Sequence, residues 1–475
     1  MYMLGVSGRQ QEAIDIGIEV LAQLGEKFPS HIRKAYLMKE MNSVKRRLHG
    51  KSDEQLLRMP QASNGDKLAC FRIMHTIYIS ALICRPTFAP ALLLRWIKLT
   101  IDYGLSAFSS VAFANYGMLC VSSFKDIDSA YRYGKLGISL LERYKTNEYL
   151  SRVYFAFYGC IFPWKRPIAK ALEPLMTGYR TGLRTGDIEG AIFCANFYVH
   201  FAFESGMDLN AVVIGWKTMY DTVTTNRLRS MLSFVVPAYQ MVQKLMGVSD
   251  DALSGKSAFL KIDDEPFDLD IADTLDTGTN EHASFSVINH VLKLICAYMD
   301  NDYKRAAREL TFLNFVKFIP PTVKKMSALF FAGMAALAGA RRGDNPRKNI
   351  RMARSLLKEL NSWRTKSPHN VMDKIFLLEA ELASVCGQNA KAKEKYLCAI
   401  ALAEHSHFGL MIGLAQERAA HHIFTMGDYE EARSIFEEAC VSYRDWGGKR
   451  KFLTLRAEIN TMYSTNIQEQ RRAVP

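Results

Sequence analysis

The sequence lacks the features that mark several classes of protein. Its 475 residues include only 14 prolines and 29 glycines, too few for a collagen-like or proline-rich chain. The nine cysteines are odd in number, scattered and without a CxxC pair, unlike the disulfide framework of a small secreted protein. Residues 1–11 have neither the basic nor the apolar stretch of a signal peptide. These absences predict a cytoplasmic protein.

One uncharged run, residues 103–124, is long enough to raise the question of a membrane span. It contains several serines, together with Gly104, Asn115 and Gly117, and this polarity disfavours insertion into a bilayer. We therefore expect helices that are buried inside the protein here.

Strand signals are nearly absent, because no run of alternating apolar and polar residues is bounded by Asn-Gly or Asp-Gly turns. Apolar residues instead recur with helical spacing, as in Leu377, Leu378 and Leu382. The sequence predicts an all-α protein.

A repeated pattern is clearest near the C-terminus. Gly427 is followed by Ala432, Phe436 and Ala439, and forty residues earlier Gly387 is followed by Ala392, Tyr396 and Ala399 at the same offsets. We expect the glycine to end a first helix with positive φ, and the alanine to lie where a second helix crosses it closely. This is the pattern of a tetratricopeptide (TPR)-type helical hairpin, and it predicts an α-α superhelix of such hairpins.

Weaker copies of the pattern recur along the chain with a period near 40. The expected structural repeat positions are Gly8, Ala13, Gly17, Ala130, Gly134, Gly186, Ala191, Ala306, Gly387, Ala392, Tyr396, Ala399, Gly427, Ala432, Phe436 and Ala439. Only seven residues precede Gly8, so the first helix of that hairpin is missing, and the helix at 12–24 is expected to expose apolar surface.

The segment 250–281 departs from the pattern, with ten acidic residues against Lys256 and Lys261. Its composition predicts a long acidic loop. The expected organisation is therefore N-terminal TPR-like repeats at 1–247, the acidic loop at 248–284, C-terminal TPR-like repeats at 285–463 and a tail at 464–475. The net charge of the whole chain is +13, and it rises to +21 without the −8 of this segment.

No motif for catalysis, cofactor binding or metal binding is recognisable. Ser254-Gly255-Lys256-Ser257 lacks the earlier glycine of a phosphate-binding loop, and Pro266 disrupts any helix that would carry Asp263, Asp264 and Glu265 as magnesium ligands. The histidine pairs 405/407 and 421/422 do not have the i, i+3 or i+4 spacing of helical metal ligands. The aromatic run at 154–164 is typical of a packed core rather than of a base-stacking platform. We therefore expect a protein that is not an enzyme and has no cofactor.

The middle of the chain resembles a particular helical region. The resemblance rests on Ser106-Ala107-Phe108, Tyr116-Gly117, the run from Asp126 to Gly134, Leu140-Leu141-Glu142-Arg143, Trp164-Lys165, Thr185-Gly186-Asp187, Leu378-Glu379-Ala380-Glu381-Leu382 and the ending Tyr443-Arg444-x-Trp446-Gly447. These residues look like the TPR-like helical region of large multidomain sensor kinases. In that family a kinase-like domain and a STAND/AAA ATPase precede the helical repeats, and GAF and histidine-kinase modules follow.

The resemblance implies a regulatory arm that binds a protein partner, or adjacent domains of a larger polypeptide, and relays that binding to neighbouring ATPase or kinase domains. Any ATPase or kinase activity would lie in domains outside this chain. Two alternatives remain: a free-standing TPR adaptor or scaffold, and a helical-repeat nucleic-acid binder, which the basic charge allows. A helical enzyme has the least support.

Overall fold

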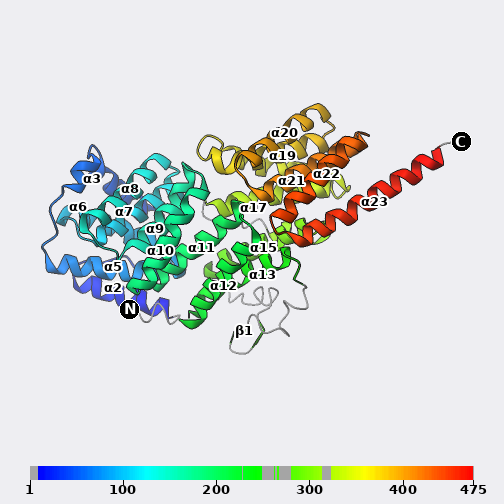
Figure 1. Ribbon diagram of the computed structural model, residues 1–475. Helices are drawn as coiled ribbons and strands as arrows, with labels where there is room; N and C mark the ends of the chain where they lie inside the picture. Colours follow the sequence, from blue (N-terminus) through cyan, green and yellow to red (C-terminus); the bar gives the residue numbers. More distant parts are fainter. Residues whose placement is uncertain are drawn as a thin grey trace. The chain divides into compact units, whose positions relative to one another are not determined.

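The computed structural model describes residues 9–226, 228–248, 261–262, 265–266, 280–312 and 322–473 (Figure 1). Within these residues the chain is almost entirely helical, as expected. The exception is a pair of two-residue strands, β1 (Lys261–Ile262) and β2 (Glu265–Pro266), paired antiparallel. They lie inside the range that was expected to be an irregular loop, most of which is outside the described residues.

The chain divides into two compact units, and three helices contribute to both. The first unit contains residues up to Tyr198 together with Met219–Leu232, and the second contains Val199–Thr218 and everything from Ser233 onward. The division thus passes through α11 (Ile188–Glu204), α12 (Leu209–Thr225) and α13 (Arg229–Leu245), whereas the sequence analysis placed its boundaries around 248–284.

The first unit is built from short and medium helices. In chain order these are α2 (Gln10–Gln23), α3 (Lys34–Leu48), α4 (Asp53–Leu57), α5 (Gly65–Cys84), α6 (Ala89–Tyr103), α7 (Phe108–Leu119), η1 (Cys120–Phe124), α8 (Ile127–Tyr144), α9 (Leu150–Tyr154), η2 (Phe155–Ile161), η3 (Phe162–Trp164), η4 (Ile168–Ala171) and α10 (Leu172–Thr185). The elements η1 and η2 are π-helices, whereas η3 and η4 are 3₁₀ turns.

The second unit continues with longer helices. These are α15 (Asn280–Met299), α16 (Tyr303–Leu310), α17 (Val323–Arg341), α18 (Pro346–Asn361), α19 (Pro368–Val385), α20 (Asn389–His405), α21 (Gly409–Thr425), α22 (Tyr429–Asp445) and α23 (Lys449–Ala473). Two boundaries differ from expectation. The helix α15 begins at Asn280, inside the predicted loop, and α23 continues to Ala473 through the predicted tail, whose Gln, Glu and Arg residues favour helix.

The turns between paired helices have the backbone conformation that the repeat pattern predicts. The φ angles of Gly186, Gly387 and Gly427 are +82°, +72° and +89°. At the end of α19 the amides of Gly387 and Gln388 donate to the carbonyls of Ser384 and Ala383, which satisfies the last free acceptors of the helix. The expected glycine turns therefore have the predicted conformation, while Gly8 lies outside the described residues.

Small residues permit close helix packing in the first unit. A β-carbon on Gly117 would lie 2.6 Å from the carbonyl oxygen of Ala130 and 2.8 Å from Cδ1 of Ile161. A β-carbon on Gly134 would collide with the ring of Phe157. Because Phe157 and Ile161 belong to η2, the π-helix packs directly onto the crossing of α7 and α8.

The uncharged and aromatic stretches are largely buried. Residues 109–117 of α7 are all buried, as expected for the run at 103–124. Phe155, Phe157 and Trp164 are at most 5% exposed, as expected for a packed core, and they lie in the short elements η2 and η3. The helix α2 buries Ala13, Ile14 and Leu21 and packs against α5, so part of the apolar surface expected to be exposed at 12–24 is covered, while Ile16 is 37% exposed.

Two other helices, α5 and α17, are long and apolar enough to cross a membrane by length and composition. Half of the apolar window of α5 and 89% of that of α17 are buried inside the protein. The burial of α17 is typical of a core helix, which satisfies the same length and composition criteria, whereas α5 is only half buried.

The close crossing at Gly117 yields a stability prediction. The substitution Gly117→Ala should lower the free energy of unfolding by about 2–3 kcal/mol. The added methyl group would meet the carbonyl oxygen of Ala130 at 2.6 Å as well as the Ile161 side chain, and the helix backbone cannot easily move away. Urea denaturation followed by far-UV circular dichroism measures the change. Gly65→Ala is the matched control, since a β-carbon there meets nothing within 4 Å and alanine favours helix. Equal effects of the two substitutions would contradict the close crossing.

Candidate functional site

The predicted repeat residues in α20 and α22 form the interior of helical hairpins. Ala392, Ala399, Ala432 and Ala439 are at most 1% exposed, and so are Tyr396 and Phe436. The two aromatic residues also contact polar groups of the preceding helices: the Tyr396 hydroxyl donates to Glu381 Oε1 at 2.5 Å, and the Phe436 ring packs edge-on against His421 at 4.9 Å. Glu381 and His421 are themselves 40 residues apart, so this contact follows the repeat.

Buried ion pairs connect three helices of the second unit. The guanidinium of Arg418 on α21 donates to both oxygens of Glu381 on α19, at 2.9 and 3.3 Å. Arg341 at the end of α17 contacts Glu381 Oε2 at 3.1 Å. The Glu381 and Arg418 side chains are only 1% and 7% exposed. One carboxylate thus joins α17, α19 and α21.

A second buried group, Glu417, connects α21 to α22 and α23. Glu417 accepts hydrogen bonds from the Lys451 ammonium at 2.7 Å and from the Tyr443 hydroxyl at 2.6 Å. Lys451, which begins the buried side of α23, also donates to Asn301 Oδ1 at 2.9 Å in the turn between α15 and α16. Lys451 is thus buried in this network, whereas Lys449 at the start of α23 is exposed.

The protonation of this network follows from burial and charge. Burial opposes ionisation of Glu381, but the charges of Arg418 and Arg341 outweigh it and lower the pKa of Glu381 to about 2. Burial, assisted by the charge of Arg418, lowers the pKa of His421 to about 3. Burial, assisted by the charge of Glu417, raises the pKa of Glu458 on α23. At neutral pH the network contains ionised Glu381 and neutral His421.

Glu417, His421 and Glu458 form a cluster that the sequence analysis missed. One ligand atom from each lies within 4.8 Å of the others, which is close enough to hold a metal ion. The missed signal is the i, i+4 spacing of Glu417 and His421 on α21, because only the adjacent histidines were considered. The Lys451 ammonium, 2.7 Å from Glu417, already neutralises this carboxylate, so a metal ion would have to compete with it.

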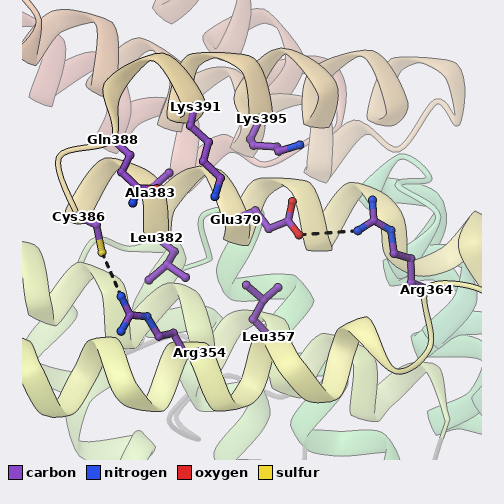
Figure 2. A pocket seen from close by; sticks show the side chains of 10 residues that line it. All are labelled: Arg354, Leu357, Arg364, Glu379, Leu382, Ala383, Cys386, Gln388, Lys391 and Lys395. Carbon is purple, nitrogen blue, oxygen red and sulfur yellow. Dashed lines mark hydrogen bonds and ion pairs between the residues drawn. The ribbon is translucent and has the colours of Figure 1, made fainter.

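A separate pocket of about 480 Å³ lies against α18, α19 and α20 (Figure 2). Its floor is apolar and is formed by Leu357 of α18 and by Leu382 and Ala383 of α19 (Figure 2). The other lining residues are Arg354, Arg364, Glu379, Cys386, Gln388, Lys391 and Lys395. Four cationic side chains and one carboxylate give the pocket a net positive charge, which suits an anionic ligand.

This pocket was missed from the sequence because its cationic residues lie on different helices, up to 41 positions apart.

The buried pair at Glu381 predicts a large loss of stability when its partner is removed. Arg418→Met should lower the free energy of unfolding by about 3–5 kcal/mol, because Glu381 would remain buried with insufficient positive charge. Thermal and urea denaturation measure the change. Arg433→Met is the control: Arg433 pairs with Glu437 at the surface, where both side chains are more than 60% exposed, and a change below about 0.5 kcal/mol is expected. A similar loss in both variants would argue against the buried network.

The buried histidine predicts a pH dependence. The pKa of His421 is about 3 in the folded protein, against about 6.5 for an unperturbed histidine. Between these values the unfolded state binds a proton that the folded state does not, so stability falls as the pH falls from 6.5 towards 3. The slope from this one group is at most about 1.4 kcal/mol per pH unit. His421→Gln should reduce the slope measured by urea denaturation between pH 6.5 and 4.5, whereas the exposed His405→Gln is the matched control. An unchanged slope in His421→Gln would contradict a neutral buried imidazole.

Comparisons with known proteins provide a context for these features. No protein-family model matches the sequence. A segment of 180 residues, 38% of the chain, is 21% identical to hybrid signal transduction histidine kinase G of Dictyostelium discoideum. The match spans only 5% of that kinase. The similarity supports a role connected with signal transduction.

Proposed function

We propose that the chain is a non-catalytic, TPR-like interaction and sensor region of a signal-transduction ATPase–kinase. The observation that carries this proposal is the similarity of 180 residues to a signal transduction histidine kinase. The region would act in the cytoplasm, where a protein partner or adjacent domains of a larger polypeptide bind to it. ATP chemistry would belong to those other domains.

The hairpin geometry supports the TPR-like part of the proposal. Five turns have a residue with positive φ followed, five positions later, by a buried alanine. The pairs are Lys125 and Ala130, Gly186 and Ala191, Asn301 and Ala306, Gly387 and Ala392, and Gly427 and Ala432. At four of these turns an aspartate follows, and its carboxylate accepts a hydrogen bond from the amide three residues on, at the start of the second helix. These residues are Asp126, Asp187, Asp302 and Asp428.

The buried ion pairs provide a physical basis for a relay. Arg341, Glu381 and Arg418 lie about 40 residues apart on α17, α19 and α21, so each contact joins one helix pair to the next. A small rotation of one helix pair would strain these charge-assisted hydrogen bonds. The strain is relieved when the neighbouring helix pair rotates with it. Binding at one end of the second unit would in this way bias whatever is attached at the other.

The test is the size and output of the native gene product. An antibody against residues 250–281 should detect a band far above 53.8 kDa in cell extract, and a strain with the locus deleted should lack it. In that longer product, Arg418→Met should alter the autophosphorylation rate several-fold, because the relay would be broken, whereas Arg433→Met should not. A native band at 53.8 kDa would contradict the proposal and leave a free-standing TPR adaptor as the better description.

A further inference from the structure

The basic pocket of the second unit is lined by cationic side chains from more than one helix. Arg354 lies on α18 and Lys391 on α20 (Figure 2). The apolar floor is formed by Leu382 and Ala383 of α19 and Leu357 of α18. Gln388, at the start of α20, adds an amide beside Lys391. The pocket therefore combines charge, hydrogen-bond donors and an apolar surface within one cavity.

Two of the four cationic residues have a carboxylate nearby and two do not. Arg364 lies 4.0 Å from Glu379, and Lys395 lies 3.1 Å from Glu394. Within the described part of the chain, neither Arg354 nor Lys391 forms an ion pair, and the only hydrogen bond of the Arg354 guanidinium there goes to Cys386 Sγ at 3.8 Å. The neighbouring Lys393, which is not a lining residue, pairs with Glu431 at 2.8 Å. The pocket thus holds two positive charges without an acidic partner among these residues.

A phosphate monoester matches this arrangement better than a carboxylate does. It carries close to two negative charges at pH 7 and has three strong acceptor oxygens, whereas a carboxylate carries one charge and two oxygens. The planar Arg354 guanidinium can donate two parallel hydrogen bonds to such a group, and Lys391 can neutralise it as a point charge. The two negative charges of the phosphate monoester then match the two positive charges of Arg354 and Lys391.

The volume of the pocket exceeds that of a phosphate group, which indicates that the phosphate is part of a larger organic ligand. A pocket of about 480 Å³ is far larger than a single phosphate group needs, and it lies in the size range of organic-ligand sites. Leu357, Leu382 and Ala383 offer an apolar surface on which the carbon atoms of a flanking side chain can pack. Inorganic phosphate would leave this surface unused.

We propose that the pocket between α18, α19 and α20 binds a phosphoserine or phosphothreonine side chain of a peptide segment, with Arg354 and Lys391 as the phosphate ligands. This proposal goes beyond the sensor function proposed above and does not depend on it, since it rests on the charges and shape of the pocket. It would make the second unit a reader of phosphorylation on a partner.

The test uses the full chain and two matched peptide libraries. One library carries a central phosphoserine with random flanking residues, and the other carries serine at the same position. The phosphorylated library should be retained on the immobilised protein, and the tightest peptide should bind at least about tenfold more strongly than its serine form, as expected for a charge-assisted contact. Retention should fall with added salt.

Variants of the exposed lining residues connect the binding to this pocket. Lys391→Ala and Arg354→Ala should each weaken binding of the phosphopeptide about tenfold or more, and Lys391→Glu should abolish it. Arg347→Ala is the matched control, because Arg347 is an exposed arginine on the same helix, α18, outside the pocket lining. Circular dichroism of each variant confirms that the fold is retained.

Three outcomes would overturn the proposal. The first is equal binding of the phosphoserine and serine libraries. The second is an equal loss of binding in Arg347→Ala and Arg354→Ala. The third is competition by inorganic phosphate at the same concentration as the best phosphopeptide, which would show a site for a small free anion instead of a peptide. Failure in any of these ways would leave the measurement of native size and kinase output unaffected.

Discussion

The second unit depends on the ion pair between Arg418 and Glu381. Both side chains are almost fully removed from water, and the cost of that removal is recovered only while the two charges remain in contact. The geometry of α19 and α21 is therefore fixed more tightly than apolar packing alone would require, because apolar contacts tolerate small shifts whereas charge-assisted hydrogen bonds have a preferred length and direction. Arg341 and Tyr396 extend the same constraint to α17 and α20.

The first unit relies on a different constraint. Its helices α7 and α8 cross closely because Gly117 and Gly134 have no side chains at the crossing. The aromatic rings of the π-helix η2 fill the space around it. A buried ionic group is present here too, since Arg152 contacts Asp187 at 3.0 Å and Glu189 at 3.2 Å. Close backbone packing nevertheless dominates around Gly117, and it leaves little freedom for substitution.

Local patterns in the sequence predicted the local structure well. The turn glycines and the buried alanines were predictable because their backbone and volume requirements are satisfied within about a dozen residues of chain. The buried network was not, because Glu381 lies in the run Leu378-Glu379-Ala380-Glu381-Leu382, where a glutamate is ordinarily expected to face solvent. Its partner Arg418 is 37 residues away, and nothing in the local sequence connects the two. The basic pocket was missed for the same reason, since three helices must pack before Arg354 and Lys391 line the same cavity.

The burial of α17 has a consequence for how the second unit folds. Sixteen of its 19 residues are buried, so almost no face of this helix is in contact with water in the folded protein. A partly assembled intermediate would therefore expose its apolar side chains to water. In a simple solenoid each repeat contacts only its neighbours, and the array can grow or fray one repeat at a time. A helix enclosed on nearly every side removes that option, because α17 reaches its final environment only when α15, α16, α18 and α19 are all in place. The second unit should therefore fold and unfold as a single cooperative block, in the manner of a globular domain.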